Sequence, residues 1–169
     1  MSNKQKMIFR GSITINLFLI LIVIWGYVKI DFAIEQLFFT EVQENLVELE
    51  GLIAHQKANN WSEPNLVTTE LGDILDGLYL GISNGKYLGW ISNDDKEILE
   101  ELSSKLRQYP HDGLYNFATL TQADINNFEE LQIKLREVGL GLNVTISNDW
   151  NSFMEKSKAL EEKIKVPLN

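Results

Sequence analysis

The sequence predicts an all-α protein: a single N-terminal transmembrane helix that continues into an extracytoplasmic antiparallel bundle of four to five helices. Two observations support this prediction. An uninterrupted apolar segment lies near the N-terminus, and beyond it apolar side chains recur at helical spacing along most of the chain. We expect three parts, namely a short basic cytoplasmic tail at 1–6, a transmembrane signal anchor at 7–29 and an acidic helical bundle at 30–169.

The membrane segment covers residues 7–28, reads MIFRGSITINLFLILIVIWGYV and contains one charged residue, Arg10, near its start. At about 1.5 Å per residue, a helix of this length spans roughly 33 Å, enough to cross a bilayer core of about 30 Å. Trp25 and Tyr27 stand at the far end, where aromatic rings favour the headgroup interface. We therefore expect the lipid bilayer to be contacted through residues 7–29.

The charges on either side of the apolar segment predict its orientation. Residues 1–30 carry four basic residues and no acidic one, whereas Asp31 and Glu35 follow the far end. The positive-inside rule places the N-terminus in the cytoplasm and the C-terminal part outside the cell membrane. The competing interpretation is a cleaved signal peptide, but the apolar run is long for one and no A-x-A-like site follows. Within the span, Asn16 is either a hydrogen-bonding residue for a partner helix or a tolerated polar residue.

The first helical pattern beyond the span predicts that the membrane helix continues as one rod to about Gln56. Its apolar residues alternate at spacings of three and four and are flanked by glutamates, which is the pattern of a coiled-coil seam. The seam residues are Phe39, Val42, Leu46, Leu49 and Ile53. Either the rest of the chain covers this seam, or a partner protein or second copy binds it; we treat these residues as partner-binding candidates.

A second amphipathic helix is predicted to begin with Ser62 as its N-cap and to run to Ile82. In the stretch that follows, Asn84-Gly85 is typical of a β-hairpin turn, yet glycines recur every fourth residue from Gly77 and the apolar residues stay in helical phase. We therefore expect the helix to end at residues 83–85, with Gly85 in the left-handed cap position.

Three more helices are expected. Residues 92–95 and 121–124 have the spacing of capping boxes, and the helices they begin should end before Pro110 and at Gly139. Residues 143–146 have strand character, and Ser147 or Asn148 should cap the last helix.

The aromatic residues Tyr79, Tyr87 and Trp90 lie close together in sequence and among glycines. If exposed, they are candidates to anchor a partner protein or to stack on a glycan, because such rings combine a large apolar area with a polar tip. The alternative is that they fill the end of the bundle between two helices.

Composition excludes several classes of function. The chain has no cysteine, which excludes disulfides, thiol catalysis and thiolate metal sites. Residues 31–169 carry 24 acidic and 11 basic residues, a balance that repels phosphate, so no nucleic-acid binding is expected. His55 and His111 have no metal-ligand spacing, and the sequence contains no P-loop or nucleophile-elbow motif. We predict no metal, no cofactor, no catalytic residue and no enzymatic activity.

The expected function is that of a non-enzymatic accessory, scaffold or interaction partner of another cell-envelope protein, acting through a protein partner or through self-association. Residue usage rich in Lys, Asn, Ile and Glu is typical of a bacterial protein. The alternative is an extracytoplasmic sensor or ligand-binding domain that signals through a partner. A cell-wall hydrolase ranks third, because it needs two carboxylates in a groove. The pair Asp94-Asp95 is better explained as first-turn helix acids.

Overall fold

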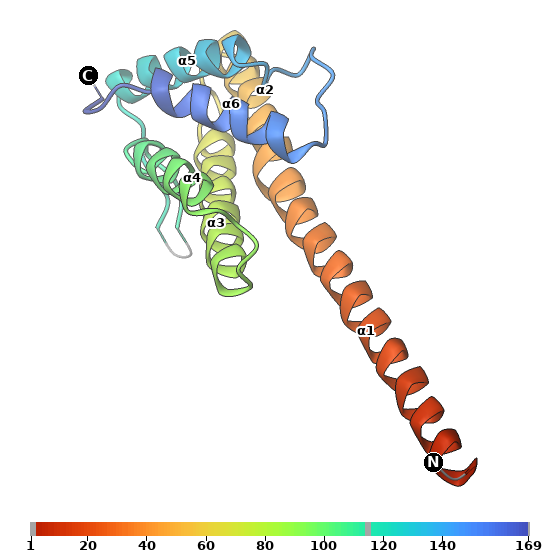
Figure 1. The fold of residues 1–169 in the computed structure, drawn as a ribbon. Helices are drawn as coiled ribbons and strands as arrows, with labels where there is room; N and C mark the ends of the chain where they lie inside the picture. Colours follow the sequence, from red (N-terminus) through yellow and green to blue (C-terminus); the bar gives the residue numbers. More distant parts are fainter. Residues whose placement is uncertain (1–2, 114–115, 169) are drawn as a thin grey trace. The chain divides into compact units, whose positions relative to one another are not determined.

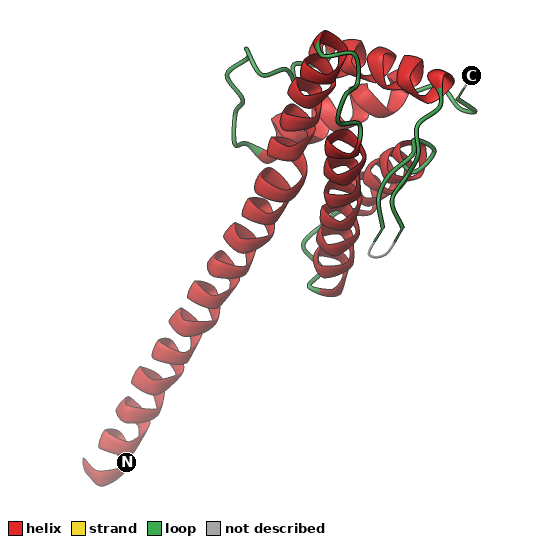
Figure 2. Cartoon of the chain, turned by 180° about the vertical axis from the view of Figure 1, so that it is seen from behind, coloured by secondary structure: helices red, strands yellow, loops and turns green. Residues whose placement is uncertain are grey.

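The structure is a computed structural model that describes residues 3–113 and 116–168. Helices and loops make up this part of the chain, and no strand is formed by the described residues (Figures 1 and 2). The all-α class is therefore confirmed, and residues 143–146 lie in a loop. The elements are α1 (Asn3–Phe38), the π-helical segment η1 (Phe39–Glu44), α2 (Asn45–Ala58), α3 (Asn65–Tyr87), α4 (Asn93–Leu106), α5 (Gln122–Glu137) and α6 (Trp150–Lys163).

One continuous helix, Asn3–Ala58, is formed by α1, η1 and α2. The predicted rod to about Gln56 is confirmed to within two residues, whereas the π-helical segment inside it was not foreseen. The apolar part of this helix is long and apolar enough to cross a membrane, criteria that a signal sequence near the N-terminus also meets. Of the tail predicted at 1–6, residues 1–2 lie outside the described part.

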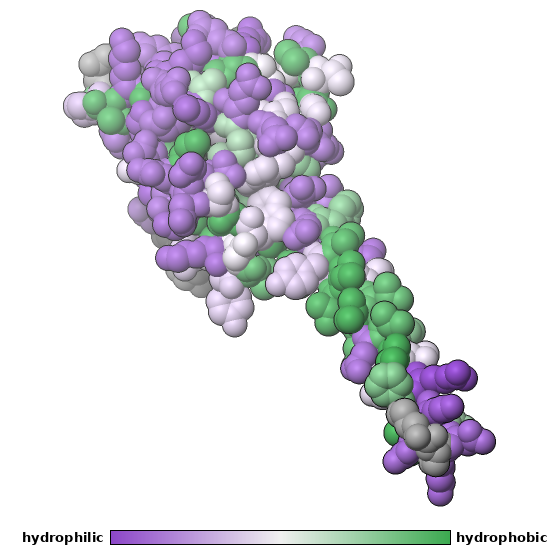
Figure 3. Space-filling model, in the orientation of Figure 1, coloured by the Kyte–Doolittle hydropathy of each residue, from purple (hydrophilic) through white to green (hydrophobic). Residues whose placement is uncertain are grey.

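Contacts divide the chain into two units, one ending at Ile34 and one beginning at Glu35. In the first unit, apolar side chains are exposed at most positions of α1 between residues 7 and 32, and so on all sides of the helix. Figure 3 shows those on one face by their green colour. Lys29 Nζ lies 5.8 Å from the ring centroid of Trp25. A helix that is apolar on every side needs an apolar environment, which its own unit does not supply.

In the second unit, α2 packs against α3 and α5, and α4 packs against α3 and α6. The segment η1 packs against α3 as well. Each of these elements contributes side chains to the core that are almost fully buried. The apolar faces of the helices are therefore covered inside this unit. Examples are Phe39, Leu46, Leu71, Leu102, Phe128 and Leu160.

Two predicted helix starts are confirmed. Ser92 caps α4, with its Oγ accepting from the backbone N–H of Asp95 at 3.0 Å. Thr121 and Asp124 form a reciprocal capping box at the start of α5, with distances of 3.2 and 2.8 Å. Both caps satisfy backbone donors that an uncapped first turn would leave without partners.

Two other predicted caps are wrong. Asp149 caps α6 in place of Ser147 or Asn148, and its Oδ2 accepts from the N–H of Ser152 at 2.9 Å. Ser62 does not cap α3, because Pro64 occupies the N-cap position and no side chain caps that end. Instead, the Gln56 side chain accepts from the N–H of Glu63 at 2.9 Å, which ties the turn to the end of α2.

The predicted end of α3 is also wrong. Gly85 is helical and buried, the helix continues to Tyr87, and Gly89 is the residue in the left-handed conformation, with φ of +65°. The N–H of Trp90 donates to the Gly85 carbonyl at 2.9 Å and the N–H of Gly89 to that of Lys86 at 3.1 Å. This pair of bonds is a Schellman motif with Gly89 as its left-handed residue.

The ends of α4 and α5 follow the predicted signals more closely. Helix α4 ends at Leu106, before Pro110, and Gly139 follows α5 with φ of +80°. The N–H of Leu140 donates to the Leu135 carbonyl at 2.9 Å, so a second Schellman motif closes α5 as Gly139 predicts.

Candidate functional site: the groove between α3 and α4

Two glycines of α3, Gly77 and Gly81, lie on the face that packs on the helix before it. A Cβ atom built at Gly77 would lie 2.6 Å from the Glu41 carbonyl oxygen, and one at Gly81 would lie 2.6 Å from Cζ of Phe38. Real Cβ atoms do not approach other atoms this closely, so only glycine permits the contact. The first two glycines of the four-residue repeat therefore make a close helix contact, whereas Gly85 faces Ile91 and Trp90 and Gly89 follows the end of α3.

The buried ring of Phe38 is the centre of an aromatic cluster that includes Trp90. Its ring centroid lies 5.2 Å from that of Trp150 and 5.7 Å from that of Phe153. Trp90 contacts Trp150 edge to face, with 4.5 Å between centroids. Such contacts stabilise a packed interior. Trp90 therefore packs within the chain, as the alternative interpretation of the predicted aromatic patch requires.

The predicted seam is also part of the core. All five seam residues are at most 2% exposed, and the chain's own helices cover them. They offer no free surface to a partner in this fold, which supports the interpretation that the rest of the chain covers the seam. The residues are Phe39, Val42, Leu46, Leu49 and Ile53.

Tyr79 and Tyr87 are the two predicted partner-binding residues that remain on the surface, at 63% and 89% exposure. The two side chains lie at different places on the surface. Tyr79 lines a groove between α3 and α4, whereas Tyr87 lies at the C-terminal tip of α3.

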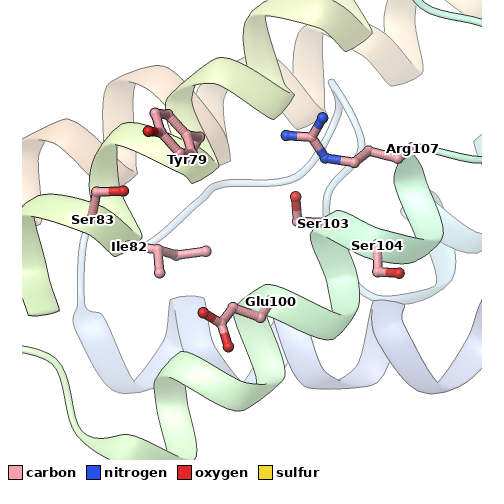
Figure 4. Close-up of a pocket in the computed structure, with 7 residues that line it drawn as sticks. All are labelled: Tyr79, Ile82, Ser83, Glu100, Ser103, Ser104 and Arg107. Atoms are coloured by element: carbon pink, nitrogen blue, oxygen red, sulfur yellow. The ribbon is translucent and has the colours of Figure 1, made fainter.

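The groove has a volume of about 300 Å³ and is lined by residues from both helices (Figure 4). Helix α3 contributes Tyr79, Ile82 and Ser83, and the facing α4 contributes Glu100, Ser103, Ser104 and Arg107. The Arg107 side chain extends from the end of α4 over the space between the helices (Figure 4). The groove therefore combines one aromatic ring, several hydroxyls and two opposite charges.

The two charges differ in their partners. Glu100 Oε2 accepts from Lys96 Nζ at 3.0 Å, so its charge is balanced within α4. Arg107 has no ion pair or hydrogen bond to any residue in the described part of the chain. A guanidinium offers two parallel N–H donors to a carboxylate or phosphate. The groove thus has one cation, Arg107, that forms no ion pair with the described residues, on a unit that is otherwise strongly acidic.

Arg107 also borders a second hollow of about 440 Å³ on the other side, where Asp73, Asp76 and His111 contribute to the wall. Asp112 in this wall is already bound, since its carboxylate accepts from Thr69 Oγ1 at 2.8 Å and from the N–H of Ala118 at 2.7 Å. That carboxylate holds the loop after α4 against α3.

Two carboxylates with buried oxygen atoms do not line the groove. Glu50 on α2, 1% exposed, accepts from Gln132 Nε2 at 2.9 Å, from Arg136 Nε and from the N–H of Leu142 at 3.1 Å. Glu70 differs, because its Oε1 is buried without a hydrogen-bond partner among the described residues. Burial, together with the nearby charges of Glu48 and Asp73, raises the pKa of Glu70 to about 7.

Other acidic residues form hydrogen bonds or ion pairs with side chains of neighbouring elements. Asp95 Oδ2 accepts from Trp150 Nε1 at 3.3 Å, and Glu129 pairs with Lys57 at 2.7 Å. The Lys57 ammonium bound to Glu129, more than any other cause, lowers the pKa of that carboxyl. Within residues 3–113 and 116–168, no group of three or more His, Asp or Glu side chains is placed to hold a metal ion.

Of the residues that line the groove, Tyr79 was predicted from the sequence, whereas Arg107 and the serines of α4 were not. Glu100, Ser103, Ser104 and Arg107 are spaced as one polar helix face, the pattern of an ordinary solvated surface. Nothing in the sequence distinguishes such a face from the wall of a groove. Comparisons with protein-family models, with curated proteins and with solved structures gave no match for this chain.

Proposed function

We propose that the chain is a single-pass membrane protein with a cytoplasmic N-terminus that displays an antiparallel helical bundle outside the cell. It serves there as a non-enzymatic accessory or scaffold of another envelope protein. The anchoring is supported by the outward-facing apolar side chains of α1 and by the basic residues Lys4 and Lys6 before them. The antiparallel arrangement is supported by register, because Gly77 meets Glu41 while the later Gly81 meets the earlier Phe38.

The observation that supports the docking surface best is Arg107, which has no ion pair among residues 3–113 and 116–168, in the same groove as the exposed ring of Tyr79. Arg and Tyr are, with Trp, the residue types that most often dominate the binding energy of protein interfaces. The occupant we propose is a segment of a partner protein that places a carboxylate opposite Arg107 and an apolar side chain against Tyr79 and Ile82. Such a segment supplies an ion pair to the one cation that lines the groove.

The test is photo-crosslinking in the native membrane, with a benzophenone amino acid at Ser83 in the groove and, as a control, at Asn126 on α5. Proteins linked only from Ser83 are identified by mass spectrometry together with the linked peptide. We expect that peptide to carry an acidic residue. Arg107→Glu should abolish the crosslink, and exchange of the partner's acidic residue for arginine should restore it.

Lys158→Glu is the matched control, since Lys158 is an exposed cation on α6 and its reversal changes net charge equally. Circular dichroism must show that each variant remains helical. A crosslink that persists in both Arg107→Glu and Tyr79→Ala overturns the docking surface. A crosslink to a second copy of this chain identifies self-association in its place.

A ligand-binding sensor is the second candidate, favoured by the hydroxyls of Tyr79, Ser83, Ser103 and Ser104, which line the same groove as Arg107. This arrangement suits a small hydroxylated carboxylate or phosphate. Isothermal titration of the detergent-purified protein with such compounds would show saturable binding that Arg107→Ala removes. Binding unaffected by Arg107→Ala would exclude this candidate.

A further inference from the structure

The C-terminal tip of α3 exposes apolar residues that the groove does not use. Tyr87 is 89% exposed and Leu88 is 43% exposed, and Lys86 precedes them. The Schellman motif at Gly89 closes the helix, and Trp90 directly after it is packed in the aromatic cluster. The helix before the tip and the packed Trp90 after it therefore hold the tip in place. Tyr87 and Leu88 are exposed as a consequence of this packing.

The register of α3 places this tip at one edge of the packed unit. Gly77 lies against Glu41 and Gly81 against Phe38, so α3 runs back along its neighbour towards Glu35, where the unit begins. Tyr87 is six residues beyond Gly81, or about 9 Å further at 1.5 Å per residue, whereas Glu35 is only about 4.5 Å beyond Phe38. The tip thus reaches the edge at which the chain leaves the unit for the apolar segment. In Figure 1 this end of α3 is remote from α5.

The charge pattern of the chain segment that forms the tip differs from that of the rest of the unit. Residues 77–93 contain no acidic residue, the longest such run beyond residue 31, and Lys86 is their only charge. An acidic surface is repelled by anionic headgroups, whereas this stretch is not. Tyrosine favours the membrane interface because its ring is apolar and its hydroxyl polar, and lysine can reach the headgroups with its ammonium.

We infer that the tip of α3 is a second membrane contact: Tyr87 and Leu88 enter the headgroup region of the bilayer that residues 7–29 cross, with Lys86 at the phosphates. This inference rests on the proposed membrane anchoring. With the anchor and the tip both in contact with lipid, the packed unit is held at two points, which fixes its orientation and leaves the Arg107 groove in water.

The absence of cysteine from the natural sequence permits a direct test with single-cysteine variants. The full-length protein is reconstituted in vesicles of phosphatidylcholine and phosphatidylglycerol and labelled with nitrobenzoxadiazole at Leu88→Cys, Leu66→Cys or Val23→Cys. Leu66 is the matched control, because it is an exposed leucine on the same helix, 38% exposed, about 33 Å along the axis from Leu88.

Spin-labelled lipids then quench any label that touches the bilayer. We expect quenching at position 88 to exceed that at position 66 severalfold and to fall to the level of position 66 when Tyr87→Asp is added. Tyr79→Asp, which introduces the same charge beside the groove, should leave quenching at position 88 unchanged.

The outcomes separate the two proposals. Strong quenching at position 23 with equal, weak quenching at 88 and 66 leaves the anchor intact and overturns the tip contact. Weak quenching at position 23 overturns the anchoring, and the tip contact falls with it.

Discussion

Gly77 is the residue at which α3 meets the main chain of η1. A methyl group there would lie 2.6 Å from the Glu41 carbonyl oxygen and 3.0 Å from Glu41 Cβ. A carbonyl in a helical turn cannot rotate aside as a flexible side chain can, so any larger residue must displace the whole segment. The glycine is therefore required by packing between two helices and not by a turn.

We expect Gly77→Ala to destabilise the packed unit by about 1–3 kcal/mol, the usual cost of overpacking. This loss should outweigh the gain of about 1 kcal/mol that alanine brings to a helix interior. Urea unfolding of the full chain in detergent micelles, followed by tryptophan fluorescence, measures the difference. Asn84→Ala, at an exposed position of the same helix, should leave stability unchanged or slightly raised. A Gly77→Ala protein more stable than the original would contradict the close contact.

Glu70 makes stability depend on pH. Its pKa is raised to about 7 in the folded protein, chiefly by burial, so the folded chain binds this proton more tightly than the unfolded chain does. The cost of ionising Glu70 is fully present above pH 7 and is relieved as the pH falls towards 4.5. The contribution of this residue to folding therefore becomes more favourable with acidification.

Glu70→Gln should remove this dependence. We expect the variant to gain about 1 kcal/mol at pH 8 and little at pH 5, a figure below the full pKa shift because the side chain is partly exposed to solvent. Unfolding free energies of the two proteins are compared between pH 5 and pH 8. Glu97→Gln, at an exposed carboxyl on α4, should show no such difference. A constant offset between Glu70→Gln and the original across this range would refute the assignment.

At the scale of elements, helix existence was predictable and several helix ends were not. The caps at Ser92 and Thr121 are local signals whose bonds form within four residues, so sequence alone sufficed. The end of α3 depends on distant residues. Gly85 is a good left-handed residue in isolation, but Phe38 and Trp90 pack around this part of α3 and favour another helical turn. Tertiary packing thus moved the cap by one turn, to Gly89.

Glu50 joins three elements through one carboxylate. It links α2 to Gln132 and Arg136 of α5 and to the backbone of Leu142 in the loop that follows. A carboxylate buried in this way stabilises only while its partners are in place, and its removal leaves polar groups in the interior without partners.

We expect Glu50→Ala to cost about 2–3 kcal/mol, because Arg136 is half exposed and recovers part of its solvation. The Leu142 amide should also lose protection against hydrogen exchange, whereas Glu50→Gln should retain part of it by keeping one acceptor. Glu155→Ala, at an exposed position of α6, is the control. Full protection of Leu142 in Glu50→Ala would show that this carboxylate does not hold the loop.

At the scale of the whole molecule, the sequence identified the apolar segment and the core but not the groove. The spacing of apolar residues indicates which of them share one face of a helix, so Leu46 and Ile53 were predicted to belong to one seam. It does not say what covers that seam, and the covering helices α3 and α5 are distant in sequence. Arg107 was not predicted as a site residue. An exposed arginine on α4 can be recognised as part of a groove only when the position of α3 beside it is known.

The boundary of the packed unit lies inside the continuous helix and not at the end of the apolar segment. Phe38 belongs to α1, yet it is fully buried among Trp90, Trp150 and Phe153. The last turns of α1 are therefore part of the core of the second unit. A soluble fragment should fold only if it keeps them.

We expect fragment 31–169 to be predominantly helical by circular dichroism and to unfold in one cooperative thermal transition, since its core side chains lie between Ile34 and Ile164. Fragment 41–169, which lacks Phe38 and Phe39, should lose cooperativity and bind anilinonaphthalene sulfonate, because two fully buried rings are absent and large-to-small truncation of one such ring already costs about 3–5 kcal/mol. Both are compared by calorimetry and near-ultraviolet dichroism. A predominantly β spectrum for fragment 31–169 would overturn the helical fold, and equal cooperativity of the two fragments would remove Phe38 and Phe39 from its core.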